Sequence, residues 1–108
     1  MKITKITEGA IHFNNGNSIT FSHDQDCCED NYADFSVLTN GTVNIDYDFN
    51  ENLIFKKVDG GGFLFGNEGH MIFVPCYSEQ NGYYTSNIDI YYNGQSVISL
   101  DCEMIYRD

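Results

Sequence analysis

The chain has 108 residues, 16 of them acidic and five basic, and its formal net charge is −11 at pH 7. So acidic a surface repels phosphate backbones and anionic membranes, which disfavours direct nucleic-acid binding. The length suits a single domain, residues 1–108, with one core. No apolar run approaches the roughly 18 residues of a transmembrane helix, and the first residues alternate polar with apolar instead of forming a signal-peptide core. We therefore expect a cytoplasmic protein that does not bind membranes.

The first clear element is a hairpin around the turn dipeptide Asn15-Gly16. Apolar residues alternate with polar ones on both sides of this turn and would share one face: Ile11, Phe13, Ile19 and Phe21. A second turn, Asn40-Gly41, precedes the segment Val43–Phe49, whose alternation predicts a strand with one solvent-exposed face.

The second half of the chain predicts further hairpins. Leu53–Val58 and Phe63–Phe65 flank a glycine-rich loop, and Met71–Tyr77 is a predicted strand in which Pro75 favours a sheet edge or a β-bulge. The last predicted hairpin turns at Asn93-Gly94. Its inward-facing residues are predicted to be Ile88, Ile90 and Tyr92 before the turn and Ile98, Leu100, Cys102, Met104 and Tyr106 on one returning strand.

Only residues 24–34 interrupt the alternation, and there Asp24 or Asp26 could cap a single helical turn through Cys27 and Cys28. The predicted fold class is therefore all-β, or β-rich α+β, with antiparallel sheets of short hairpins forming a sandwich or an open barrel. At most one short helical turn is expected, near residues 24–34.

The same interruption holds the main candidate site. Side chains that can donate, accept, ligate or ionise follow one another without a break: His23, Asp24, Gln25, Asp26, Cys27, Cys28 and Glu29. Such a run is costly to bury without partners, so we expect it to be exposed for a purpose or to be paired. Asp30 and Asp34 extend its negative charge. A second candidate surface is the tyrosine- and amide-rich stretch that ends at Tyr83 and Tyr84, residues well suited to an interface.

The four cysteines divide by their positions. Cys76 and Cys102 share faces with apolar neighbours and are expected to be small buried hydrophobes. Cys27 and Cys28 are adjacent, so they cannot both face one core. In a reducing cytoplasm we expect free thiols and no disulfide framework.

Two chemical alternatives centre on His23, Cys27 and Cys28. A zinc site would have the right ligand types but lacks a cysteine pair separated by two to four residues. A Cys–His nucleophilic pair is disfavoured because the neighbouring carboxylates would raise the thiol pKa. A small-ligand or nucleotide site that uses the run as a pocket wall is a third alternative. We assign no catalytic residue, no metal ligand and no cofactor.

Two segments carry a resemblance. The run HDQDCCED, followed by Tyr32, Ala33, Asp34 and Phe35, and the run FVPCYSEQNGYYTSNIDI resemble a family of small uncharacterised proteins of bacteriophages, prophages and gut bacteria. The resemblance implies a genetic context and no reaction. In that context we expect a non-enzymatic, acidic protein-binding module, for example an inhibitor of the anti-CRISPR or another anti-defence type. Its partner would be a host protein with a basic surface, and the chain's oligomeric state is left open.

Overall fold

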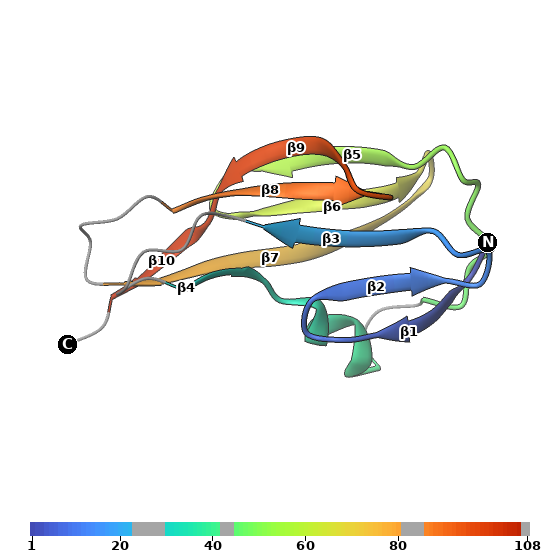
Figure 1. The fold of residues 1–108 in the computed structure, drawn as a ribbon, viewed down its shortest axis with the longest axis horizontal. Helices are drawn as coiled ribbons and strands as arrows, with labels where there is room; N and C mark the ends of the chain where they lie inside the picture. The colour runs from blue at the N-terminus through green and yellow to red at the C-terminus, as the bar shows by residue number, and fades with distance from the viewer. Residues whose placement is uncertain (23–29, 42–44, 81–85, 107–108) are drawn as a thin grey trace.

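The computed structural model describes residues 1–22, 30–41, 45–80 and 86–106. Strands dominate these residues, and the helical element among them is the 3-10 turn η1 (Phe35–Thr39). The strands form two sheets that pack face to face and run along the long axis of the molecule (Figure 1). The predicted all-β fold is confirmed, and its form is a sandwich. No helix in the described part of the chain is long and apolar enough to cross a membrane.

Sheet 1 contains β1 (Ile3–Ile6), β2 (Ala10–Phe13), β3 (Ser18–Ser22), β8 (Asn87–Tyr92) and β9 (Gln95–Asp101), in the order β1-β2-β3-β8-β9. All its pairs are antiparallel. Both predicted turns are confirmed, because Gly16 and Gly94 adopt positive φ angles of 90° and 81° that suit glycine.

Sheet 2 contains β5 (Ile54–Val58), β6 (Gly62–Asn67), β7 (His70–Gln80) and β10 (Glu103–Tyr106), in the order β10-β7-β6-β5. The short strand β4 (Asp30–Ala33) also pairs with β7, antiparallel. β10 pairs with β7 in the parallel sense, so sheet 2 is mixed. The predicted β5–β6 hairpin is confirmed, with Val58 opposite Gly62.

Pro75 lies within β7, where Gly62 of β6 is its partner on one side. On the other side its carbonyl accepts a 2.8 Å hydrogen bond from the Asp34 amide. The reciprocal bond would need an N–H that proline lacks, and β4 ends at Ala33, one residue earlier. Among the described residues, this side of β7 pairs with a strand only from Cys76 to Glu79. The proline therefore marks an edge on one side of an otherwise internal strand.

The predicted strand Val43–Phe49 is wrong in its described part, residues 45–49. Ile45, Tyr47 and Phe49 do turn inward while Asp46 and Asp48 are exposed, but the segment joins no sheet. The Phe49 amide donates to the Met1 carbonyl at 2.6 Å. Alternation here reflects an extended segment lying along the core, since burial alone imposes a period of two on any extended chain.

The returning strand of the last hairpin is also corrected, because the chain changes sheets at Cys102. β9 ends in sheet 1 at Asp101, and β10 begins in sheet 2 at Glu103. The Cys102 amide donates to the Ser86 carbonyl at 2.8 Å, which fixes the crossing point. The chain stays extended through the crossing, so the predicted inward positions of Ile98, Leu100 and Met104 hold, although on two strands.

The helical turn expected near residues 24–34 is not found in the described part of that segment. Residues 30–33 form β4, and the 3-10 turn η1 comes directly afterwards, with Asp34 as its N-cap. The N-cap of η1 is thus Asp34, a later aspartate of the acidic segment than the two that were proposed. The proposed caps Asp24 and Asp26 lie outside the described residues.

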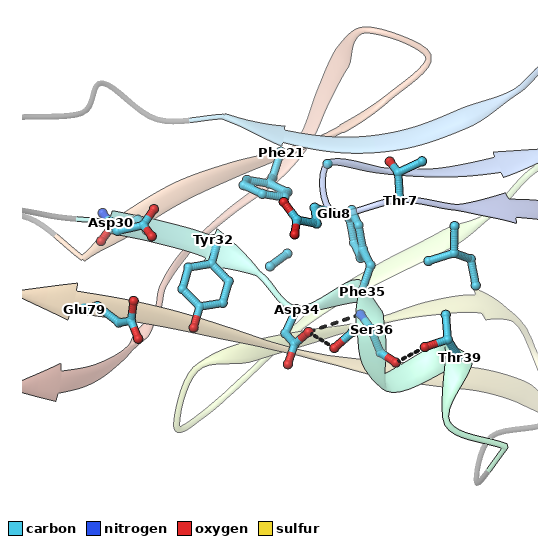
Figure 2. A pocket seen from close by; sticks show the side chains of 14 residues that line it. Thr7, Glu8, Phe21, Asp30, Tyr32, Asp34, Phe35, Ser36, Thr39 and Glu79 are labelled. Carbon is cyan, nitrogen blue, oxygen red and sulfur yellow. Dashed lines mark hydrogen bonds between the residues drawn. The ribbon is translucent and has the colours of Figure 1, made fainter.

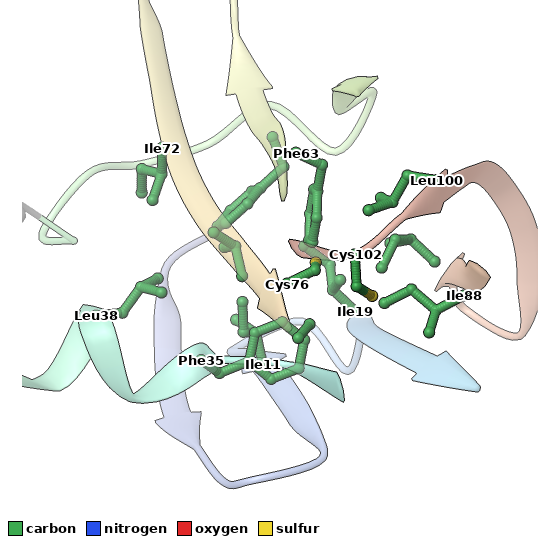
Figure 3. Close-up of a cluster of buried hydrophobic side chains, with 14 of the residues drawn as sticks. Ile11, Ile19, Phe35, Leu38, Phe63, Ile72, Cys76, Ile88, Leu100 and Cys102 are labelled. Atoms are coloured by element: carbon green, nitrogen blue, oxygen red, sulfur yellow. The ribbon is translucent and has the colours of Figure 1, made fainter. Parts of the chain in front are cut away.

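The core lies between the two sheets and is rich in phenylalanine and isoleucine. Cys76 and Cys102 are confirmed as buried and lie together in this core (Figure 3). They are free thiols. A hydrogen bond with Cys102 raises the pKa of Cys76, and burial raises it further, so the thiol stays protonated. These two cysteines therefore act as core residues.

Candidate functional site

A cavity of about 1050 Å³ opens between β4, η1 and the turn that joins β1 to β2 (Figure 2). Its apolar wall is formed by Ile6, Phe21 and Phe35. The rings of Phe21 and Phe35 meet edge to face, with their centroids 5.7 Å apart. The polar lining of the cavity comes from separate elements. We call this cavity the acidic groove because four carboxylates line it: Glu8, Asp30, Asp34 and Glu79.

No lysine, arginine or histidine is among the described residues that line the acidic groove. Lys2 forms a 3.4 Å ion pair with Asp46, and Lys56 and Lys57 lie on β5, which contributes nothing to the lining. The described wall of the groove therefore contributes carboxylates and no base. Such a concave surface of one sign attracts cations more strongly than isolated surface carboxylates do.

Asp30 and Glu79 are directly opposite each other on β4 and β7. The pairing therefore brings carboxylates from two distant segments of the chain together at this end of β7.

The pKa of Tyr32 responds to the negative charges of the groove. Tyr32 lies between Asp30 and Asp34 in sequence and opposite Tyr77 in the β4–β7 pair, with the two rings 5.9 Å apart. Partial burial raises the pKa of the Tyr32 phenol, and the negative charges of Glu79, Asp34 and Asp30 raise it further. Three of the four groove carboxylates are thus close enough to influence the same phenol.

Asp34 has a structural role as well. Its carboxylate accepts a 3.1 Å hydrogen bond from the Ser36 amide and another from the Ser36 hydroxyl, and so caps η1. The Thr39 hydroxyl closes the same turn by donating to the Ser36 carbonyl at 2.7 Å (Figure 2). The turn is therefore held by side chains that also line the groove.

Buried polar side chains connect β4 to β7 on the core side of the sheet. The Ser78 hydroxyl donates to the Asn31 side-chain oxygen, and the Gln80 amide donates to the Ser78 hydroxyl at 2.6 Å. All three side chains are buried. Since buried polar groups need their partners, this trio fixes the register of β4 and hence the position of Asp30 and Tyr32 above it.

Of the residues predicted for the site, the structure brings Asp30 and Asp34 together in the acidic groove. The other predicted residues lie outside the described part of the chain: His23, Asp24, Gln25, Asp26, Cys27, Cys28, Glu29, Tyr83 and Tyr84. Sequence reasoning missed Glu8 and Glu79. Glu8 stands alone in a turn, and only the pairing of β4 with β7 would have placed Glu79 beside Asp30.

Carboxylates, hydroxyls and aromatic rings suit the recognition of cationic side chains, since carboxylates pair with lysine and arginine and rings accept their aliphatic stems. Within the described ranges, no group of three or more His, Cys, Asp or Glu side chains is placed to hold a metal ion. No protein family, no curated protein and no solved structure matches this chain. The groove itself is therefore the feature from which a function can be inferred.

Proposed function

We propose that this chain is a non-enzymatic protein-binding module whose acidic groove accepts a basic segment of a partner protein. The observation that carries the proposal is the convergence of four carboxylates, Glu8, Asp30, Asp34 and Glu79, on one groove whose described lining includes no base. A bound lysine or arginine would pair with these carboxylates.

The composition of the groove indicates how a basic segment would be held. A guanidinium or ammonium group would pair with the carboxylates at the rim, while its stem would lie against the rings of Phe21 and Tyr32. The net charge of −11 would speed the encounter with a basic surface and make the rate of association depend on salt. The biological partner we propose is a host protein with a basic surface, such as a defence nuclease, which the chain would inhibit by occupying that surface.

The site can be tested with a fluorescein-labelled oligo-arginine peptide and the groove variant Glu8→Gln/Asp30→Asn/Glu79→Gln. Asp34 is left in place because it caps η1. Exposed ion pairs contribute about 0.5 kcal/mol each, so losing three should weaken binding about tenfold. Fluorescence anisotropy at low and at physiological salt would measure the affinity, which we expect to fall as salt rises.

The matched control is Asp59→Asn/Glu68→Gln/Asp101→Asn, which removes three exposed carboxylates outside the acidic groove. Its net charge equals that of the groove variant, so it separates a site from a general field. If the two triple variants bind equally well, the groove is not the site. If binding does not change with salt, the electrostatic basis of the proposal is wrong.

The partner itself can be sought by capture from bacterial lysate with tagged wild-type protein, at low and at high salt, with mass spectrometry of the eluate. The groove variant serves as the negative bait. A protein that elutes with salt, is captured by the wild type and by the control variant, and is lost with the groove variant would be the partner we propose.

A further inference from the structure

The strand β4 has one strand partner among the described residues, the strand β7. All four residues of β4 line the acidic groove, so that β7 lies on one side of this strand and Phe21 and Glu8 lie on the other (Figure 2). We call the edge of β4 that faces away from β7 the groove edge. A strand edge of this kind is a template for pairing with a further strand. The groove therefore offers a partner backbone contacts as well as side-chain contacts.

The hydrogen bond at the end of β4 shows which backbone groups point to the groove edge. The Asp34 amide donates to the carbonyl of Pro75, its partner in the continued register, at 2.8 Å. Directly opposite residues of an antiparallel pair exchange backbone bonds at every second position, so the positions of β4 that bond to β7 are those of Asp30 and Tyr32. The backbone groups of the intervening residues, including Ala33, point to the groove edge.

The side chains of β4 alternate between the two faces of sheet 2. Asn31 and Ala33 are buried, whereas Asp30, Tyr32 and the following Asp34 are part-exposed on the outer face, which points away from the core. Residues directly opposite each other in an antiparallel pair share a face. Every second residue of a strand added to the groove edge would therefore lie beside the acidic side chains, and the residues between them would point inward.

The inward side of the groove is apolar. Phe35 is buried, and Phe21 is partly buried and packs against the core. With Ile6, these two rings form the apolar wall of the groove. A charged side chain that points at this wall would lose its water without gaining a partner, so apolar residues suit the inward positions of an added strand.

We propose that the basic segment of the partner binds as an antiparallel strand added to the groove edge of β4, with basic and apolar residues in alternation. This inference rests on the proposed function and specifies the segment that the groove accepts. Basic residues would lie opposite Asp30 and Asp34, and apolar residues opposite Asn31 and Ala33. The residue opposite Tyr32 would be a third basic one, because a guanidinium or ammonium group is attracted to an aromatic ring.

Charge also decides which strand can be added. Strand addition to a sheet edge is a recurrent way of binding an extended peptide, in which backbone bonds supply affinity and alternate side chains supply specificity. Charged side chains on an edge strand oppose pairing with an edge of the same charge. Asp30 and Asp34 would thus repel the same edge of a second copy and accept a basic segment.

The alternation can be tested with a fluorescein-labelled peptide of five residues, Arg-Val-Arg-Val-Arg, which matches residues 30–34 in length. The matched control is the shuffled peptide Arg-Arg-Arg-Val-Val, which has the same composition and charge but places an arginine at one inward position. Fluorescence anisotropy with the unaltered protein would measure both affinities. We expect the shuffled peptide to bind about tenfold more weakly, because one valine loses its place against the apolar wall.

The backbone pairing can be tested by N-methylation of the alternating peptide. In the proposed arrangement the two valine amides donate to β4 and the arginine amides point away from it. Methylating both valine amides should weaken binding at least about tenfold, whereas methylating the second and third arginine amides should leave it within about twofold. The two methylated peptides have the same charge and the same number of methyl groups, so they differ only in which backbone donors are lost.

Hydrogen exchange followed by NMR gives a second measurement, on the protein itself. The bound alternating peptide should slow exchange of the Ala33 amide, which points to the groove edge, more than exchange of the Tyr32 amide, which points to β7. Equal slowing of the two amides would contradict the added strand.

The inference would also be overturned if both methylated peptides bind alike, or if methylated arginine amides weaken binding more than methylated valine amides do. Equal binding of the alternating and shuffled peptides would overturn the alternation. The proposed function is decided separately, by the oligo-arginine affinities of the groove variant and its matched control. That contrast depends on the arginine side chains and persists if the backbone pairing is wrong.

Discussion

The two sheets differ in which side chains they expose and which they bury. Sheet 1 is polar outside, where Ser99 donates to Asp89 across the β8–β9 pair, and apolar inside. Sheet 2 exposes Phe73 and its apolar neighbours, yet buries the polar trio Asn31, Ser78 and Gln80. Sheet 1 thus follows the usual pattern of an antiparallel sheet with one solvated face, and sheet 2 departs from it on both sides.

The difference is consistent with the proposed binding site, which involves sheet 2. A solvated face needs only polar side chains, and sheet 1 supplies them. Sheet 2 retains exposed apolar side chains, and at the β4 end it places two carboxylates opposite each other. The acidic groove that we propose as the binding site includes Asp30 and Glu79 from this end of sheet 2.

The largest effect is expected inside sheet 2. Ser78→Ala leaves the buried Asn31 and Gln80 side chains each without one hydrogen bond, so we expect the free energy of unfolding to fall by about 2 kcal/mol. Chemical denaturation with urea would measure it. The loss should also loosen β4, which would appear as faster amide exchange at Tyr32.

The matched control on the other sheet is Ser99→Ala. Ser99 is exposed, so its bond to Asp89 competes with water, and the change should stay within about 0.5 kcal/mol. Equal losses of unfolding free energy for the two variants would mean that the buried trio stabilises the protein no more than a surface hydrogen bond does. The proposed difference between the inner faces of the two sheets would then be wrong.

A smaller loss of stability is expected on the outer face of sheet 2. In Gly62→Ala the new Cβ atom would lie 2.6 Å from the Phe73 ring and 2.8 Å from the Val74 carbonyl oxygen, so the ring must move away and the strand must shift. We expect a loss of about 1 kcal/mol, measured by thermal unfolding. Gly9→Ala, whose Cβ would meet nothing within 4 Å, should be neutral or slightly stabilising. A neutral Gly62→Ala would show that Phe73 does not lie on the glycine.

Alternation in the sequence predicted which side chains face the core, including Ile19, Ile88, Cys76 and Cys102, because burial imposes its period directly on an extended chain. It could not predict the partner of each segment. Cys102 continues the alternation while the chain leaves one sheet for the other, and Ile45–Phe49 alternates without joining a ladder. Pairing depends on contacts between distant segments, which a local pattern does not contain.

The same limit applies to the acidic groove. Asp30 and Asp34 were found because acidic residues are dense in that segment. Glu8 and Glu79 come from a turn and a strand that the fold brings to the same place, and neither stands out in its own surroundings. A site built from several elements is therefore only partly visible from sequence, through the element that carries most of its charge.

The smallest effect is an electrostatic one, in the acidic groove. Burial raises the pKa of Tyr32 above its ordinary 10.0, with Glu79 the next cause, so Glu79→Gln should lower this pKa towards the ordinary value. NMR titration of ¹³C-labelled tyrosine would follow it, with Glu68→Gln as the control at an exposed site outside the groove. Because the folded pKa is the higher one, the stability linked to Tyr32 is complete below pH 10.0 and is lost as the pH rises through the folded pKa.

A bound oligo-arginine peptide should also lower the pKa of Tyr32, because it neutralises the same carboxylates. If the peptide binds and this pKa stays unchanged, the peptide occupies another surface.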